Sequence, residues 1–82
     1  MTSVMHIKAR ITPWDDMAFV KAFEHARDEV HGTDNEPDGT MAGAMVQHLL
    51  HEAGYPNARV DVIQSVNEKL ERTSHWLVSR DG

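Results

Sequence analysis

The two ends of this chain alternate apolar and polar residues, and the stretch between them does not. Near the start, the apolar positions are Met5, Ile7, Ala9 and Ile11. Near the end, the same alternation places Val60, Val62, Val66, Trp76 and Val78 on one side. Alternation with a period of two indicates a strand with one buried face. Strands from both ends must therefore meet in one sheet, and the middle of the chain must cover that buried face.

The first part of the middle has the spacing of an amphipathic helix. Its apolar stripe consists of Phe19, Phe23, Ala26 and Val30. Thr12 is a candidate N-cap, Pro13 suits the first helical position, and Gly32 is a natural stop. These signals predict a helix over about residues 13–31.

A second apolar stripe follows a polar loop at residues 33–39. The stripe consists of Ala42, Met45, Val46, Leu49, Leu50 and Ala53. Asp38 or Thr40 can cap this helix, and Gly54 followed by Pro56 ends it. Gly43 costs up to about 1 kcal/mol relative to alanine inside a helix, so we expect close packing there, against the first helix.

Residues 66–72 allow two interpretations. Asn67 to Glu71 can form the loop of a hairpin between two antiparallel strands, whereas Ser65 and Glu68 have the spacing of a capping box that would start a short helix. We favour the hairpin. The element order is then strand, helix, helix, strand, strand. It predicts an α+β domain of two layers, with two helices on one face of a three-stranded, mainly antiparallel sheet. A fully antiparallel sheet is the simplest solution, and the strand order stays open.

Length and charge restrict the class of protein. The chain has 82 residues, which predicts a single domain over 1–82, and it lacks cysteine, which excludes disulfides and thiolate zinc sites. The net charge is −5, and the acids concentrate in residues 13–57. This charge opposes nucleic-acid binding, which needs several cations on one face. No basic leader or long apolar run is present, so we expect a soluble, cytoplasmic protein that does not bind membranes.

The polar loop carries a weak candidate metal site. Asp34, Glu36, Asp38 and Gly39 match the spacing that opens a calcium-binding loop. The twelfth position, however, is Met45 rather than a bidentate carboxylate, and Pro37 falls inside the turn. We therefore interpret the segment as a solvated acidic loop.

A second candidate metal site lies on the second helix. His48, His51 and Glu52 are neighbours at helical spacing and are plausible zinc ligands. No further ligand from elsewhere in the chain can be identified. We interpret these residues as the solvated face of the helix.

Catalytic motifs are lacking. There is no cysteine nucleophile, no serine–histidine–aspartate arrangement and no glycine-rich phosphate loop. His25 and Glu29 form an i,i+4 pair that is typical of an exposed helix surface. We expect neither catalytic residues nor a cofactor.

The outer face of the sheet is the better candidate for function. It combines basic residues on the first strand with apolar residues on the last two, and the residues that we expect to bind a partner are Lys8, Arg10, Ile63, His75 and Leu77. An open sheet face and open sheet edges often bind a second copy or a partner strand. We expect a small interaction or regulatory protein, a homodimer or a binder of another protein, from a bacterial or mobile-element reading frame. The alternatives are weak calcium or zinc binding, and mimicry of nucleic acid by the acidic middle.

Overall fold

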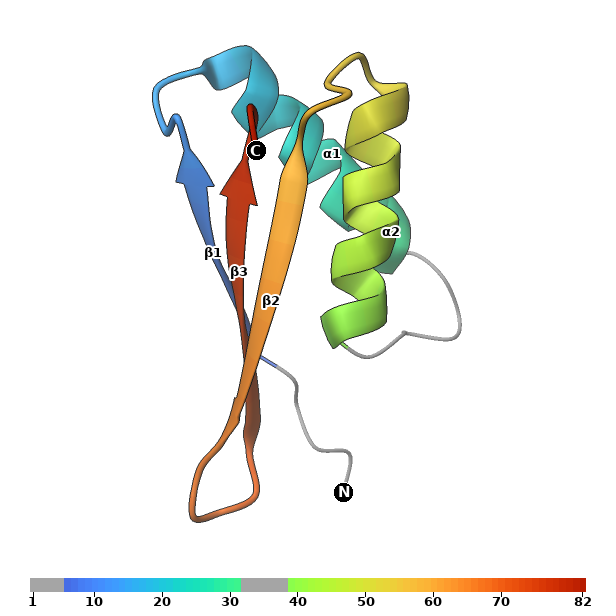
Figure 1. Cartoon of the computed structure of the whole chain (residues 1–82). Helices are drawn as coiled ribbons and strands as arrows, with labels where there is room; N and C mark the ends of the chain where they lie inside the picture. Colours follow the sequence, from blue (N-terminus) through green and yellow to red (C-terminus); the bar gives the residue numbers. More distant parts are fainter. Residues whose placement is uncertain (1–5, 32–38) are drawn as a thin grey trace.

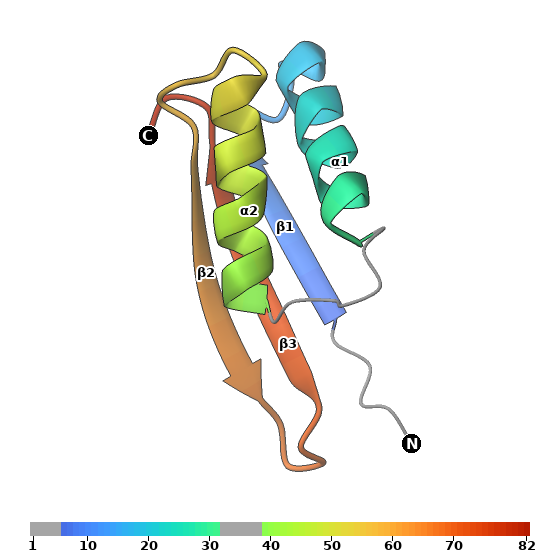
Figure 2. The same ribbon diagram turned by 90° about the vertical axis from the view of Figure 1, so that its right-hand side faces the viewer.

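The computed structural model describes residues 6–31 and 39–82, which form two helices and a three-stranded sheet. The elements in order are β1 (His6–Thr12), α1 (Met17–His31), α2 (Gly39–Glu52), β2 (Arg59–Val66) and β3 (Arg72–Ser79). Both helices lie on one side of the sheet, as Figure 2 shows. The predicted α+β architecture is confirmed. Neither described helix is long and apolar enough to cross a membrane.

The sheet is mixed rather than fully antiparallel. Its order is β1-β3-β2, with β3 in the centre (Figure 1). β3 runs antiparallel to β2 and parallel to β1. The expectation of a fully antiparallel sheet is wrong because β1 does not pair with β2. The two helices reverse the chain once and the hairpin reverses it again, so β3 runs in the same direction as β1.

Helix α1 begins four residues later than predicted, and its cap is Asp16 rather than Thr12. The Asp16 Oδ1 atom accepts a hydrogen bond from the amide of Phe19 at 3.2 Å. Thr12 is still part of β1, and its carbonyl oxygen accepts the amide of Arg80 at 3.0 Å. Because the Thr12 carbonyl oxygen is bonded to Arg80, it does not accept the first bond of a helix, and α1 starts at Met17.

The core lies between the helices and β2 and β3. The predicted stripe of α1 is buried throughout, and Phe23 packs edge-to-face on Trp76 with ring centroids 6.1 Å apart. The buried apolar residues are Phe19, Phe23, Ala26, Val30, Ala42, Val46, Leu50, Ala58, Val60, Trp76 and Val78. Aromatic pairs of this geometry stabilise a fold by about 0.5–1.5 kcal/mol beyond the contribution of their buried area. Most of the core was thus predicted by periodicity.

Gly43 packs closely, but against the sheet and not against α1. A Cβ atom at this position would overlap the Val62 side chain and would lie 3.4 Å from that of Val60. The absence of a side chain lets α2 approach β2. The predicted close approach is confirmed, and the predicted neighbour is wrong, because α2 lies over the sheet at this point.

The end of α2 has the predicted glycine stop. Gly54 has a φ of 105°, which favours glycine, and its amide donates to the carbonyl oxygen of His51 at 3.2 Å. The amide of Tyr55 donates to the carbonyl oxygen of Leu50 at 3.0 Å. These two bonds form the Schellman motif. At the other end of α2, Thr40 lies inside the helix and is not its cap.

Residues 66–72 form the hairpin and not a short helix. The turn is closed by the Leu70 amide, which donates to the Asn67 carbonyl oxygen at 3.0 Å, and the Asn67 side chain accepts two further amides. Leu70 has a φ of 61°, which is costly for a bulky residue. The hairpin extends beyond the helices (Figure 1). Val66 was expected to face them and is instead 58% exposed, because no helix reaches that far along β2.

Candidate functional site

The face of the sheet turned away from the helices, which we call the open face, is defined by the strand register. Trp76, Val78 and Val60 are buried under the helices, so their neighbours in sequence point the other way. The open face consists of Lys8, Arg10, Thr12, Arg59, Asp61, Ile63, Ser65, Thr73, His75, Leu77 and Ser79. All five residues that the sequence proposes for partner binding belong to it.

Together with Asp61, these five residues form two adjacent rows across the strands. In one row Arg10 of β1 lies beside Leu77 of β3, which lies beside Asp61 of β2. In the next row the order is Lys8, His75 and Ile63. Because paired residues in a sheet have their Cβ atoms about 4.5–5.5 Å apart, each row is a continuous contact surface.

The open face presents apolar side chains to solvent. Ile63 is 55% exposed and Leu77 is 44% exposed, and both Lys8 and Arg10 are exposed. A shallow depression of about 280 Å³ lies between β1 and β3 and is lined by residues 8–10 and 75–77. It is too shallow and open to enclose a small molecule, so this surface fits a macromolecule better.

Charge is distributed unevenly over the open face. The β1 side carries Lys8 and Arg10, and the β2 side carries Asp61 and Arg59, with Leu77 lying between Arg10 and Asp61. Asp61 is already paired, since its Oδ1 atom lies 2.9 Å from Nε of Arg59. The row of Arg10, Leu77 and Asp61 has a cation at one end, an apolar residue in the middle and, at the other end, a carboxylate that also pairs with Arg59.

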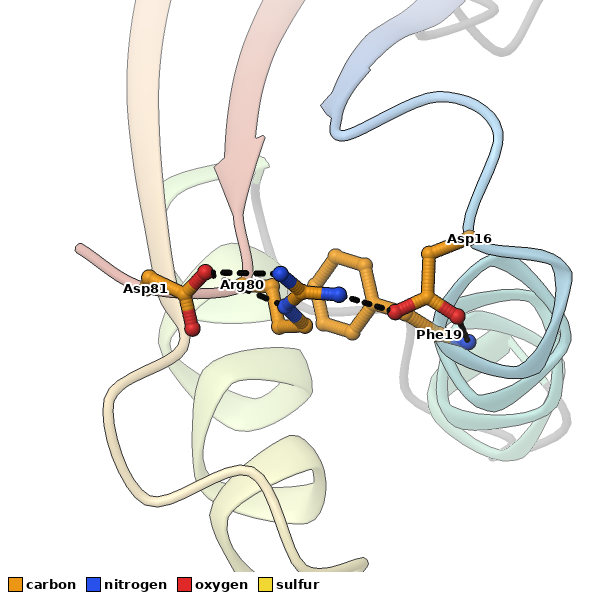
Figure 3. Close-up of polar contacts among 4 residues, drawn as sticks. All are labelled: Asp16, Phe19, Arg80 and Asp81. Atoms are coloured by element: carbon orange, nitrogen blue, oxygen red, sulfur yellow. Dashed lines mark hydrogen bonds and ion pairs between the residues drawn. The ribbon is translucent and has the colours of Figure 1, made fainter.

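A cluster of charged residues joins β3 to the start of α1 (Figure 3). The guanidinium of Arg80 donates to Oδ2 of Asp16 and, at 2.9 Å and 3.1 Å, to Oδ2 of Asp81. The hydrogen bond from Arg80, and after it the amide of Phe19, lower the pKa of Asp16. Asp81 and then Asp16 raise the pKa of Arg80. This cluster holds the first turn of α1 against the end of the sheet, and we assign it a structural role.

The Asp16 cluster leads to a prediction about acid stability. The pKa of Asp16 is lower in the folded chain than in the unfolded chain, so its contribution to stability is present above the ordinary aspartate pKa of about 3.9 and is lost as the pH falls further. We expect Asp16→Asn, which keeps a good N-cap, to lower the Tm at neutral pH.

The difference in Tm between wild type and Asp16→Asn should shrink as the pH falls below about 4 and should vanish once wild-type Asp16 is protonated. Thermal unfolding followed by circular dichroism from neutral to acidic pH measures it. A difference that stays constant across this range would contradict the assignment.

The residues of the candidate zinc site do not converge. His48 Nε2 lies 3.0 Å from Glu52 Oε1, an exposed pair one helical turn apart. The ring of His51 lies instead against β2, with Nε2 2.7 Å from the carbonyl oxygen of Ala58. A carbonyl oxygen can only accept, so Nε2 of His51 carries the proton and donates it. Within residues 6–31 and 39–82, no three histidine or carboxylate side chains are placed to hold a metal ion.

The candidate calcium residues, Asp34, Glu36 and Asp38, lie outside the described residues. His25 and Glu29 form the predicted exposed pair, with Nε2 and Oε1 3.3 Å apart. Sequence reasoning missed the cluster of Asp16 and Arg80, because these residues are 64 positions apart. Asp16, just before the helix, was the one sequence signal that could have located the N-cap of α1.

Comparisons with known proteins leave the function to be argued from the geometry. The chain matches no protein-family model, no curated protein and no solved structure at a significant level.

Proposed function

We propose that this chain is a small, non-enzymatic interaction protein that forms a homodimer by packing its open face against the open face of a second copy. The observation that carries the proposal is the row of Arg10, Leu77 and Asp61. A surface that binds itself must be self-complementary about a twofold axis. This row has opposite charges at its two ends and an apolar residue at its centre.

The row is complementary to itself when the twofold axis runs parallel to the strands and passes over β3. Such an axis places β1 of one protomer opposite β2 of its partner. Each Arg10 then faces an Asp61, and the two Leu77 side chains meet at the axis. In the neighbouring row Lys8 faces Ile63, and the two His75 rings meet.

An axis perpendicular to the strands gives a worse fit. It places β1 opposite β1, so that Lys8 and Arg10 face the same basic residues of the partner. Like charges brought together in this way oppose association. The charge pattern therefore favours one of the two arrangements of stacked sheets.

The size of the open face limits the expected affinity of the dimer. Three strands at a spacing of about 4.8 Å and seven residues at about 3.3 Å each give a flat area of roughly 15 by 23 Å. This area is small beside the roughly 800 Å² that each partner buries in a standard interface. We therefore expect a reversible dimer with a dissociation constant on the order of 10 μM or weaker.

Replacing Leu77 with aspartate tests the proposal. The change puts two carboxylates at the centre of the interface, and we expect it to weaken the dimer at least about a hundredfold. Sedimentation equilibrium from micromolar to millimolar protein measures the mass. Leu70→Asp is the matched control, since Leu70 is 77% exposed at the hairpin tip, outside the open face. The control should dimerise like the wild type.

Exchanging the charges of the row adds a second test. Arg10→Asp alone should weaken the dimer, and Arg10→Asp combined with Asp61→Arg should restore it, because the attraction across the axis is rebuilt. A wild-type chain that stays monomeric at millimolar concentration, or a Leu77→Asp variant of unchanged mass, would refute the dimer.

A further inference from the structure

The two edges of the sheet differ in how their backbone groups are satisfied. At the β2 edge, Oε1 of Gln47 accepts the amide of Val60 at 2.9 Å, and Nε2 of His51 donates to the carbonyl oxygen of Ala58 at 2.7 Å. Both side chains come from α2. They occupy backbone groups that could otherwise pair with an incoming strand, so the start of β2 is protected.

The β1 edge has no comparable protection among the residues that the structure describes. The carbonyl oxygen of Thr12 accepts the amide of Arg80 on β3, so the even-numbered residues of β1 direct their backbone groups toward β3. Because these directions alternate along a strand, Ile7, Ala9 and Ile11 direct their amides and carbonyls outward. No described side chain bonds to the backbone of Ala9 or Ile11, and residues 8–10 are exposed. Figure 1 shows β1 at the outer edge of the sheet.

The side chains along this edge define the chemistry of a strand that would pair there. Lys8 and Arg10 lie on the open face, where a fourth strand would place its residues directly beside them. Cross-strand pairs of opposite charge are favourable, so acidic residues fit these positions. On the other face the edge carries Ala9, which is exposed, and Ile11, which is half-buried, so small apolar residues fit there.

A second copy of the chain fits this edge poorly. Antiparallel pairing of two β1 strands about Ala9 would place Lys8 of one copy beside Arg10 of the other, twice. Like charges directly opposite each other destabilise a strand pair. The charge of the edge therefore selects a different chain.

We propose that the outer edge of β1 binds an extended segment of another protein, one in which acidic and small apolar residues alternate, as a fourth strand of the sheet. Main-chain hydrogen bonds to Ala9 and its odd-numbered neighbours hold the segment, and Lys8 and Arg10 select its acidic residues. This binding uses the backbone of the sheet edge, whereas the proposed dimer uses the side chains of the open face; Lys8 and Arg10 belong to both surfaces.

Fluorescence anisotropy with a short labelled peptide of alternating glutamate and valine tests the proposal. The same peptide with lysine in place of glutamate is the control ligand. We expect the glutamate peptide to bind the full chain and the lysine peptide to bind at least about tenfold more weakly. Equal binding of the two peptides, or no binding of the glutamate peptide, overturns the proposal.

The variant Ala9→Pro tests the backbone contact itself. Proline removes the outward amide of residue 9 and leaves the hydrogen bonds between β1 and β3 intact, which is tolerated on an edge strand. We expect this variant to lose about tenfold or more in affinity for the glutamate peptide. Ala9→Val, which keeps the amide, is the matched control and should bind like the wild type. A folded Ala9→Pro variant with wild-type affinity overturns the proposal.

The charge reversal Lys8→Glu with Arg10→Glu keeps the proposal testable if Ala9→Pro fails to fold. It should reverse the preference, so that the lysine peptide binds more tightly, and an unchanged preference overturns the proposal.

The molar mass of Ala9→Pro in solution shows whether the dimer depends on the edge of β1 or on the open face. If Ala9→Pro still dimerises, the dimer does not need the edge of β1, which supports the proposal. If this change alone abolishes the dimer, the edge binds a second copy of the chain, and the proposal is overturned. A monomeric wild type that binds the glutamate peptide refutes the dimer and leaves the edge site standing.

Discussion

Replacing Trp76 with alanine is expected to reduce the free energy of unfolding by about 3–5 kcal/mol, the largest loss from any single change considered for this chain. Trp76 is 1% exposed on the central strand and packs edge-to-face on Phe23. Small domains have a total stability of about 5–15 kcal/mol. The alanine variant should therefore be close to unfolding at room temperature.

The variant Trp76→Phe is the control for this result. The Nε1 atom of Trp76 is buried without a hydrogen-bond partner among the described residues. An unsatisfied buried donor costs about 1–3 kcal/mol, and phenylalanine removes that donor while it keeps an aromatic ring. We expect Trp76→Phe to lose less than half of what Trp76→Ala loses.

Urea unfolding followed by circular dichroism measures both Trp76 variants, because the signal does not depend on the tryptophan that is removed. An alanine variant that unfolds within about 1 kcal/mol of the wild type would show that Trp76 is not the centre of the core.

Replacing Gly43 with alanine is the second large effect. In an exposed helix this change raises stability by about 1 kcal/mol, because alanine is the better helix former. At Gly43 the new Cβ atom would overlap the side chain of Val62, whose χ1 angle has few alternatives. Overpacking of this kind costs about 1–3 kcal/mol, so we expect a net loss of stability despite the better propensity.

The sign of the change in the free energy of unfolding caused by Gly43→Ala shows whether packing or helix propensity is the larger effect. Val62→Ala removes the overlapping atom, so the double variant should be more stable than the sum of the two single losses predicts. Ala44, the next residue, is exposed and reports propensity alone, so Ala44→Gly should lose about 1 kcal/mol. Urea unfolding of the four variants gives the coupling energy between positions 43 and 62. A Gly43→Ala variant that is more stable than the wild type would contradict the close approach of α2 to β2.

The elements that the sequence predicted well are those that depend on neighbouring residues. The stripe of Phe19, Phe23, Ala26 and Val30 and the hairpin loop at Asn67–Glu71 follow from spacing within a few positions. The start of α1 was misplaced because Thr12 has two possible roles. Its pairing with Arg80 in the sheet decides between them, and that pairing is not visible in local sequence.

The strand order was inaccessible for the same reason. A strand such as β1 has one alternating pattern whether it pairs with β2 or with β3, so the pattern cannot distinguish a mixed sheet from an antiparallel one. The open face was predictable because alternation assigns each residue to a face whatever the order of the strands. The residues Lys8, Arg10, Ile63, His75 and Leu77 therefore came out on one surface, although the sheet is mixed and not fully antiparallel.

The contacts of the β2 edge had no sequence signal. His51 was interpreted as part of the solvated face of the helix and Gln47 was not singled out, because nothing in helical periodicity shows that a side chain reaches a backbone group on a strand. Such contacts depend on how α2 lies on the sheet, which Gly43 controls.

The central position of β3 affects how the chain folds during synthesis. A ribosome produces the chain from its N-terminus, and domains fold as the required residues emerge. Both strand pairs of this sheet include β3, the last strand to emerge, so β1 waits for a partner about 67 positions further along the chain. Until Arg72–Ser79 emerge, no strand pair of the sheet can form. Pairing of the sheet therefore waits until residues 72–79 are free of the ribosome, and β1 is the strand that waits longest for its partner.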